Sequence, residues 1–475
     1  MPFNFINLSP VVILAIGAIV SIVLEPLLKN TSKHRFIPWV SASFIVLAAV
    51  PYLFAVQADI HSLFTMNPLQ RLLAYGVLLS AFVGIGGIQF TLAKEQSRGG
   101  EAYGLLLLAT TGVLLMLHSM DYLALFIGME LASFPIYALV AYRRKSQEGN
   151  EAVFKYFLSG TVFSVVFLYG VSLIYGATGS THFASVVLEG RENLYIAGFL
   201  LVLFGLLFKA GAAPVHYWVA DVYTGAPVSV TAFMAAVVKV GALAALSSVW
   251  LTIPSTMLLK HTHSLEIIIL SVAFISIIIG ALSGLAQKSI RRILAFSAVM
   301  NAGFMVLGLL LPNFSNHSVH LGPMYFFLLT YAIASVGALT GISYFSGEND
   351  EKENLDSIRG MGRTNPLVGM SVIVCLASLA GIPPVAGFMA KFVLFSGLFS
   401  AQYHAVAITG FLLSIVAAVY YIRIAYVLFA SGQQPKETLK HNTPDSRSYL
   451  LKLGVLLTAL SLLILSVIPK IGLIV

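Results

Sequence analysis

The sequence predicts an all-α polytopic membrane protein with about 14 transmembrane helices of about 20 residues each. Composition is the first reason: 58% of the 475 residues are hydrophobic, only 10% are charged, and the mean hydropathy is +0.92. Such values exclude a soluble globular domain. The second reason is that long apolar runs recur along the whole chain. The third is that the longest polar stretches, 177–194, 346–365 and 431–448, are short enough for surface loops.

The apolar runs are long enough to cross the hydrocarbon core of a bilayer. The expected spans are 10–28, 37–56, 70–93, 103–118, 121–142, 152–176, 195–213, 227–250, 265–285, 291–311, 322–345, 366–398, 404–430 and 449–469. Only the His118–Asp121 segment separates the fourth from the fifth, and prolines break the 366–398 run. We do not expect the first span to be a cleaved signal peptide, because Met1–Pro10 contains no lysine or arginine.

We expect a single integral membrane domain over residues 1–475. Its expected parts are helices 1–3 in 1–100, a first repeat in 101–250, a second repeat in 264–430 and a last helix in 449–469. Helices 4–8 and 9–13 look like two five-helix units, each with a proline-broken segment beside a lysine. An odd number of helices per unit makes the repeat inverted, and paired broken segments in two halves point to a transport site.

Basic residues concentrate in the odd-numbered loops between the expected spans. They are Lys29, Lys33, Arg35, Lys94, Arg98, Arg143, Arg144, Lys145, Lys288, Arg291, Arg292, Lys352, Arg359, Arg363, Lys436, Lys440 and Arg447. The even-numbered loops and the C-terminal end hold Arg191, Lys260 and Lys470. Because lysine and arginine favour the cytoplasmic side, we expect both termini outside. The spread over short loops also argues against a nucleic-acid surface, despite the net charge of +8.

The residue pattern excludes several classes of cofactor protein. The single cysteine, Cys375, rules out a disulfide framework and an iron–sulfur cluster held by this chain alone. No glycine-rich phosphate loop follows a strand pattern, and no zinc-ligand spacing occurs. We therefore expect no metal and no cofactor bound by this chain.

Four ionisable residues lie inside apolar runs: Glu130, Lys209, Lys239 and Lys391. A charge in hydrocarbon costs roughly 2.5 kcal/mol or more, so such groups face a protein interior or a wet cavity and mark proton or ion pathways. The structural alternative is that the lysines snorkel to an interface. For Glu130, it is a protonated acid hydrogen-bonded between helices.

Prolines beside two of these lysines break their helices. A proline leaves the carbonyl four residues earlier without its N–H partner. Pro214 frees the carbonyl of Ala210, and Pro383 and Pro384 free those of Leu379 and Ala380. Free carbonyls cannot face lipid, so these stretches must be buried in protein or hydrated. A hydrated break beside an amine is what a proton path requires.

Four further polar residues have both a local and a functional interpretation. Lys155 follows Glu151 by four residues, which predicts an i,i+4 pair, but it could instead tune the deeper charges. His216 follows the first break and is either a loop residue or a relay. Asp221 is expected to fix that loop. Asp121 is expected to cap the fifth span.

Three sequence segments carry a resemblance to a known family. The stretch P-V-H-Y-W-V-A-D-V-Y-T-G-A-P at 214–227 resembles a signature of the antiporter-like subunits of respiratory complex I, in the form of subunit N. The segments G-M-E-L-A-S-F-P-I-Y at 128–137 and Q-K-S-I-R-R-I-L-A-F-S at 287–297 agree with it. The similarity extends over nearly the whole chain.

The resemblance implies a fourteen-helix fold with two inverted five-helix repeats and a proton-translocating role. The family's relay residues map onto Glu130, Lys209, Lys239 and Lys391, with Lys155 matching a lysine that is often present in helix six. Proton movement would be driven by quinone reduction elsewhere in a bacterial NADH:quinone oxidoreductase of the inner membrane. NADH, FMN, iron–sulfur clusters and quinone would bind to other subunits, and M-like and K-like subunits would be neighbours.

Two positions bear on this assignment. Many relatives have a histidine after the serine of helix ten, where this chain has Asn301, which cannot take up a proton. A lysine at 391, where subunit M has glutamate, disfavours the M type. The alternatives are a subunit of an Mrp-type cation/proton antiporter or of a membrane-bound hydrogenase, and a passive scaffold.

Overall fold

The computed structural model describes residues 5–28, 30–54, 63–94, 99–142, 146–183, 190–253, 255–311, 321–346, 354–431 and 449–467. The described part of the chain is helical, without β-strands other than isolated bridges. Many of the basic loop residues lie outside it: Lys29, Arg98, Arg143, Arg144, Lys145, Lys352, Lys436, Lys440, Arg447 and Lys470. The side chains of Lys33, Arg35, Lys94 and Lys260 are also outside the description. The predicted orientation therefore stays a prediction.

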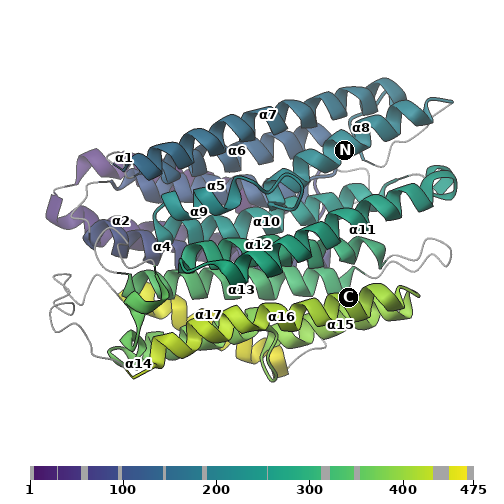
Figure 1. Ribbon diagram of the computed structural model, residues 1–475. Helices are drawn as coiled ribbons and strands as arrows, with labels where there is room; N and C mark the ends of the chain where they lie inside the picture. Colours follow the sequence, from purple (N-terminus) through teal and green to yellow (C-terminus); the bar gives the residue numbers. More distant parts are fainter. Residues whose placement is uncertain are drawn as a thin grey trace.

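The helices pack side by side with their long axes roughly aligned (Figure 1). In chain order they are α1 (Phe5–Leu27), α2 (Asn30–Ala49), α3 (Pro51–Phe54), α4 (Pro68–Lys94), α5 (Glu101–His118), α6 (Tyr122–Val140), α7 (Gln147–Thr178), α8 (Glu192–Ala210), α9 (Val219–Gly225), α10 (Val228–Leu251), α11 (Ser255–Ala286), α12 (Ile290–Leu307), α13 (Gly322–Phe345), α14 (Pro366–Ala380), α15 (Ala386–Ser400), α16 (His404–Phe429) and α17 (Tyr449–Val467). Short 3-10 helices lie at Gly308–Leu310, Leu355–Ile358 and Met361–Arg363.

Thirteen of the described helices are long and apolar enough to cross a membrane. The predicted 366–398 span forms two shorter helices instead, α14 and α15, because the chain breaks at 381–385. The predicted hinge between the fourth and fifth spans is confirmed, since α5 ends at His118 and α6 begins at Tyr122. Asp121 caps α6 as expected: its Oδ1 accepts hydrogen bonds from the backbone N–H groups of Leu123 (2.8 Å) and Ala124 (3.0 Å).

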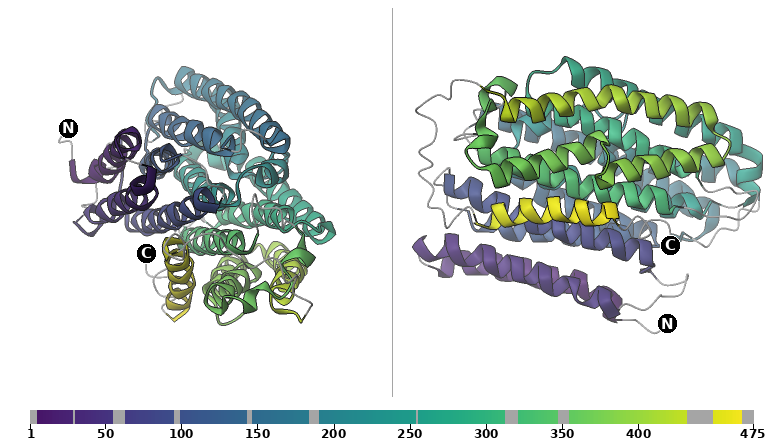
Figure 2. Two further views of the ribbon diagram at one scale, coloured as in Figure 1. Left: turned by 90° about the vertical axis from the view of Figure 1, so that its left-hand side faces the viewer. Right: turned by 90° about the horizontal axis from the view of Figure 1, so that it is seen from below.

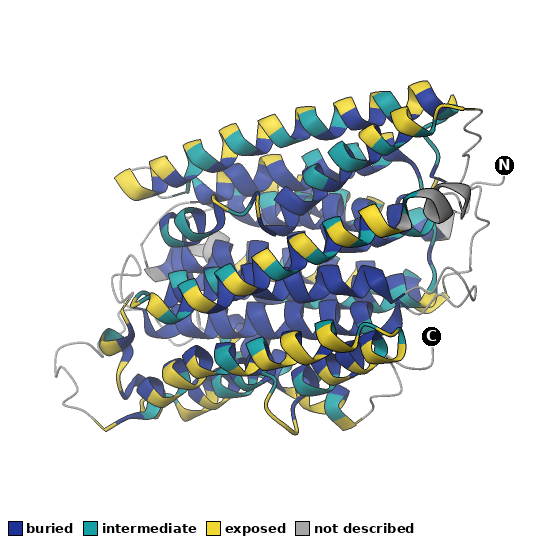
Figure 3. Ribbon diagram, turned by 45° about the vertical axis from the view of Figure 1, so that its right-hand side comes forward, coloured by how far each residue is buried: buried dark blue, intermediate teal, exposed yellow. Residues whose placement is uncertain are grey.

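Helices α10, α12 and α13 form the centre of the bundle (Figure 2). The apolar windows of α10 and α13 are buried over their whole length, whereas only a third of the windows of α7 and α16 is buried. The outer helices expose apolar stripes such as Phe154, Val165 and Tyr169 on α7 (Figure 3). A helix that is apolar all round and enclosed by other helices is shielded from lipid. The centre is therefore where a charged group can be kept out of hydrocarbon.

Two helix breaks have similar local structure. Gly211 (φ +68°) follows the last residue of α8 and Gly381 (φ +78°) follows that of α14, so both helices end with the left-handed conformation that glycine adopts without strain. Each break leads into a second helix, α9 or α15. The segments match in sequence as well: A-G-A-A-P-V at 210–215 and A-G-I-P-P-V at 380–385. The predicted broken helices seven and twelve are thus confirmed, while the limits of the repeats stay a prediction.

Close backbone contact between α5 and α6 gives a first test of the packing. A Cβ atom added at Gly112 would lie 2.3 Å from the backbone nitrogen of Ala132. We expect Gly112→Ala to lower the thermal stability of the assembled complex by about 1–3 kcal/mol, the usual cost of overpacking. Gly176→Ala is the control, because a Cβ there meets only a Leu194 methyl at 3.6 Å. Equal melting temperatures for the two variants would contradict the packing described.

Candidate functional site

The three lysines from the apolar runs are buried in the bundle. Lys209 on α8, Lys239 on α10 and Lys391 on α15 are 2%, 3% and 3% exposed. None of them snorkels to the surface of this chain, so the structural alternative considered for them does not hold. A buried ammonium must be compensated by hydrogen bonds or opposite charge. The partners of each lysine therefore define what the site can do.

Lys209 donates to side-chain oxygens of α6. Its Nζ lies 2.7 Å from the Ser133 hydroxyl and 3.4 Å from the Tyr137 hydroxyl. Ser133 is about one turn after Glu130 on α6, so Lys209 bonds to the turn that follows this carboxyl group. Within the described residues, Lys209 and Glu130 do not form a direct ion pair. Glu130 instead accepts a hydrogen bond from the Ser164 hydroxyl of α7 at 2.5 Å. The site thus places a carboxyl group on α6 about one turn from the hydroxyl that binds the Lys209 amine of α8.

Lys239 binds a backbone carbonyl near the first break. Its Nζ donates to the carbonyl of Ala298 on α12 at 2.5 Å and lies 5.8 Å from the centre of the Tyr331 ring on α13. It also lies 3.8 Å from the position that a Cβ of Gly211 would occupy. No carboxylate within the described residues pairs with it. Its charge is therefore stabilised by dipoles rather than by a counter-ion.

Lys391 occupies the second break and confirms the prediction about free carbonyls. Its Nζ donates to the carbonyl oxygens of Leu379 (2.9 Å) and Ala380 (3.1 Å). These are the two carbonyls that the Pro383–Pro384 pair leaves without N–H partners. They are also the C-terminal end of α14, where the helix dipole favours a positive charge. The lysine thereby caps the helix that the prolines end.

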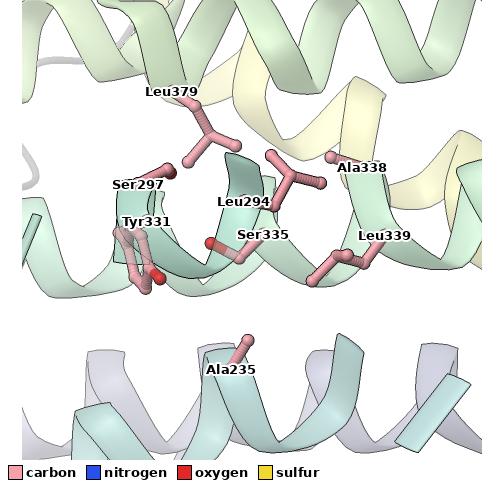
Figure 4. A pocket seen from close by; sticks show the side chains of 8 residues that line it. All are labelled: Ala235, Leu294, Ser297, Tyr331, Ser335, Ala338, Leu339 and Leu379. Carbon is pink, nitrogen blue, oxygen red and sulfur yellow. The ribbon is translucent and has the colours of Figure 1, made fainter. Parts of the chain in front are cut away.

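A small cavity is lined by residues of α10, α12, α13 and α14 (Figure 4). Its volume of about 10 Å³ is near the minimum that holds one water molecule. The lining residues are Ala235, Leu294, Ser297, Tyr331, Ser335, Ala338, Leu339 and Leu379. Ala235 is one turn before Lys239, and Leu379 provides a carbonyl to Lys391. The wall of this cavity is therefore partly polar, with hydroxyl groups from α12 and α13.

Polar groups of α12 and α16 lie next to this cavity. Ser297, which lines it, has its hydroxyl 2.5 Å from the hydroxyl of Tyr421. Asn301, with no exposed surface, donates to the Ser297 carbonyl at 2.8 Å and to the Tyr421 hydroxyl at 3.1 Å. The sequence motif at 287–297 ends at Ser297, but the sequence assigned no role to this serine or to Tyr421. A tyrosine in a transmembrane run gives no signal of its own, because tyrosine is frequent in such helices.

Lys155 is not one of the buried lysines: it belongs to a partly exposed cluster of ion pairs. Its ammonium is 2.7 Å from Glu151, as the i,i+4 spacing predicted, and 2.7 Å from Asp221. Arg292 of α12 lies 3.6 Å from Asp221. Asp221 thus fixes α9 to α7 and α12, in agreement with its predicted role in the loop. The structure shows no hydrogen bond or ion pair that joins Lys155 to Glu130 or Lys209 among the described residues.

His216 lies in the loop of the first break, half-buried. Burial lowers the pKa of its imidazole below the ordinary value, although a hydrogen bond at the backbone of Pro214 opposes this. Its Nδ1 is buried without a hydrogen-bond partner within the described residues. No hydrogen bond joins the ring to the three buried lysines within the described residues.

Comparison with known proteins agrees with this arrangement. Residues 119–417 match the family model described as NADH:quinone oxidoreductase/Mrp antiporter, transmembrane. NADH-quinone oxidoreductase subunit N of Protochlamydia amoebophila is 31% identical, over 93% of this chain and 92% of that protein. NADH-quinone oxidoreductase subunit 14 of Thermus thermophilus is 36% identical, over 81% of this chain and 83% of that protein.

A solved structure has the same fold along almost the whole chain. It is a chain of respiratory complex I from Thermus thermophilus with bound aureothin, with a TM-score of 0.81 and 31% identity, over 97% of both chains. Fold and sequence thus agree along almost the whole chain. The chain belongs to the NADH:quinone oxidoreductase/Mrp antiporter family of membrane subunits, in the branch of NADH-quinone oxidoreductase subunit N.

Proposed function

We propose that this chain is a proton-translocating membrane subunit of an NADH:quinone oxidoreductase. Protons cross the membrane through it while electrons pass from NADH to quinone in other subunits. NADH, FMN, iron–sulfur clusters and quinone bind to those subunits, and this chain acts through ionisable side chains alone. The expected neighbours are M-like and K-like membrane subunits. The complex lies in a bacterial inner membrane, with both termini of this chain on the outer side.

The observation that carries the proposal is the burial of three amines that have no direct counter-ion among the described residues. Lys209 binds hydroxyls, whereas Lys239 and Lys391 bind backbone carbonyls. A hydroxyl or carbonyl oxygen stabilises an ammonium less strongly than a carboxylate would. Burial also disfavours the charged form of the lysine. Such an amine can take up and release a proton when its surroundings change. An apolar side chain could fill the same space without the free-energy cost of burying a charge, so a purely structural role does not require lysine.

The arrangement supports a route along the bundle centre. Lys239 takes up a proton from the cytoplasmic side and passes it toward Lys391, which releases it outside. Glu130 and Lys209 control this loading, because moving the carboxylate toward or away from the amine changes how strongly Lys209 holds its charge. The ion pairs of Lys155 and the loop residue His216 are peripheral to this route.

Reconstitution of the assembled complex in proteoliposomes tests the function. NADH and quinone should drive proton uptake into the vesicles, and a triple Lys209→Met, Lys239→Met, Lys391→Met variant should assemble but lose the protons that this subunit moves per NADH. Native gels establish assembly, and NADH oxidation normalises the pumping. A triple variant that pumps as the unmodified complex does would favour the passive scaffold.

The second candidate is a cation/proton antiporter subunit, which the family description favours as the alternative. It predicts proton exchange that depends on sodium and needs no electron donor. The same proteoliposomes distinguish the two functions: a pH gradient that collapses on sodium addition without NADH would replace the proposed function.

Glu130→Gln tests the coupling between α6 and α8. The amide keeps the size and the hydrogen bond from Ser164 but removes the ionisable carboxyl group that we propose controls Lys209. We expect the pumping rate to fall by about tenfold, equivalent to ~1.4 kcal/mol of lost interaction, while assembly is preserved. The initial rate of proton uptake per NADH oxidised is the measurement. Glu266→Gln, at a partly buried tyrosine contact on α11, is the control and should leave that rate unchanged.

A further inference from the structure

We propose that the C-terminal end of α16 binds the headgroup of an anionic phospholipid. Arg423 is the deeper cation of this lipid site, and Arg363 is the cation at the membrane surface. The Tyr426 hydroxyl lies between these two levels along the helix. The lipid site faces outward from the bundle, so the inference stands apart from proton movement through the buried lysines.

The outward face of α16 is a stripe of apolar side chains. Exposed apolar residues recur every three or four positions along the helix: Ile408, Leu412, Ile415, Val419, Ile422 and Tyr426. This spacing places them on one side of α16. Because α16 lies at the edge of the bundle (Figure 1), the stripe is the surface that α16 presents to the membrane.

Arg423 interrupts this stripe with a positive charge. It follows Val419 by one turn, precedes Tyr426 by about one turn, and is exposed. Within the described residues it makes no hydrogen bond and no ion pair. Arginine stays charged in proteins, so Arg423 cannot become neutral to suit apolar surroundings. The charge therefore needs a partner beyond the described residues.

The position of Arg423 along α16 places the charge below the membrane surface. Helix α16 has 26 residues, which is about 39 Å of helix against a hydrocarbon core of about 30 Å. A centred helix thus extends beyond the core by about 4–5 Å at each end. Arg423 is six residues before the last residue, Phe429, so its Cα lies about 4–5 Å inside the hydrocarbon. A charge at this depth must be paired or solvated.

The direction of the Arg423 side chain works against an escape to the nearer surface. Side chains of an α-helix tilt toward its N-terminus, and Arg423 is close to the C-terminal end of α16. Its Cα–Cβ bond therefore points toward the centre of the membrane. An anionic group that descends to the arginine resolves this conflict, and anionic phospholipids carry such a group at the membrane surface.

A second arginine lies at the same end of α16. The 3-10 helix Met361–Arg363 packs here, and the N–H of the preceding Gly360 donates to the carbonyl of Val427 at 3.0 Å. Arg363 is exposed, and its Nη2 lies 3.4 Å from the Ser431 hydroxyl. No carboxylate pairs with it in the described part of the chain. Two arginines without acidic partners thus lie at two depths along one edge.

Tyr426 completes the lipid site between the two arginines. It is 69% exposed, and tyrosine is enriched where membrane helices meet the headgroups. Its hydroxyl can donate to a phosphate or an ester oxygen. A phosphate at this level therefore receives donors from Arg423, Tyr426 and Arg363, and hydrogen bonds between arginine and phosphate are charge-assisted.

This combination favours a lipid over two other partners. A carboxylate of a neighbouring subunit would pair with Arg423 but would leave Arg363 and the Tyr426 hydroxyl without a role. A free phosphate ion would use the donors but not the apolar stripe beside them. A phospholipid fits both parts, because its phosphate meets the arginines while its acyl chains lie along the stripe. A net negative headgroup is favoured over a zwitterionic one near two arginines.

Photo-crosslinking in the assembled complex tests the proposal. Tyr426 is replaced by the photoreactive p-benzoylphenylalanine, in nanodiscs with equal amounts of anionic phosphatidylglycerol and zwitterionic phosphatidylcholine. We expect lipid adducts in which phosphatidylglycerol exceeds phosphatidylcholine by at least about fivefold, the factor for one arginine near an anionic headgroup. Mass spectrometry of the adducts is the measurement. The same probe in place of Ile408, near the other end of the stripe, should give the ratio of the nanodisc.

Two arginine variants, each combined with the probe at position 426, identify the charge that selects the lipid. Arg423→Gln should lower the enrichment in phosphatidylglycerol by about fivefold. Arg191→Gln is the matched control, because it removes an exposed arginine at the start of α8, where the guanidinium bonds the Gly176 carbonyl. It should leave the enrichment unchanged. The ratio with Arg423 present decides the proposal even if Arg423→Gln assembles poorly.

Three results would overturn the inference. A crosslink from position 426 to a neighbouring subunit would make this face a protein interface. Adducts in the ratio of the nanodisc, or enrichment that survives Arg423→Gln, would make it an unselective lipid surface. Loss of the enrichment in an excess of inorganic phosphate would identify a site for a free anion. None of these results bears on the proposed function, because the lysine relay does not use Arg423.

Discussion

Replacing Lys239 with methionine is expected to abolish the proton movement that this subunit contributes. Methionine keeps the length and apolar stem but cannot carry a proton. The described residues around Lys239 offer a carbonyl and an aromatic ring, so no neighbouring side chain can substitute for the amine. Proton uptake per NADH, followed with a pH-sensitive dye in proteoliposomes, is the measurement. We expect the contribution of the subunit to fall by at least about tenfold, since each ~1.4 kcal/mol of added barrier is a factor of ten.

Assembly should survive this substitution. The variant removes the hydrogen bond from Lys239 to the carbonyl of Ala298, but this carbonyl lies inside α12 and keeps its helical N–H partner. It also removes the cost of burying an ammonium. Lys288→Met, at an exposed loop position before α12, is the matched control and should pump normally. Normal pumping by an assembled Lys239→Met complex, with the control equally active, would refute the central role of this amine.

Replacement of Lys391 is expected to have the second large effect, on stability as well as on pumping. Lys391→Met leaves two buried carbonyls, those of Leu379 and Ala380, without a donor. At about 1–3 kcal/mol for each unpaired group, the loss of stability should exceed that of Lys239→Met. Thermal unfolding of the assembled complex and proton uptake per NADH are measured on the same preparations.

Lys391→Arg separates the two roles of this lysine. Arginine keeps a positive charge and the donors for the two carbonyls, but it does not give up its proton in proteins. We expect the arginine variant to regain most of the stability lost in Lys391→Met while pumping stays absent. An arginine variant that pumps at the normal rate would show that Lys391 is only a helix cap.

The sequence predicts the features of this fold that depend on local chemistry. Apolar runs predict the long helices, and prolines with adjacent glycines predict the breaks at 211–218 and 381–385. The partner of Lys391 could also be predicted, because Pro383 and Pro384 identify the carbonyls that lack an N–H group. The i,i+4 pair of Glu151 with Lys155 and the cap at Asp121 follow from the same short-range rules.

Contacts between distant segments could not be predicted in this way. Lys239 binds the carbonyl of Ala298, 59 residues further along the chain, and every residue has a carbonyl. Ser297 and Tyr421 are 124 residues apart, and neither helix carries a pattern that brings the two hydroxyls together. Such contacts depend on how the helices pack, and uniformly apolar helices leave their rotation about the long axis unspecified.

The position of Lys391 on the end of α14 has a mechanical consequence. When the amine is protonated, it donates hydrogen bonds to the last carbonyls of α14. When the amine is neutral, these hydrogen bonds are weaker. By thermodynamic reciprocity, a force that bends the hinge between α14 and α15 must change how readily the amine holds its proton. The Nζ atom of Lys391 thus both carries the proton and stabilises the end of α14. Mechanical strain transmitted from other subunits can therefore promote release of that proton.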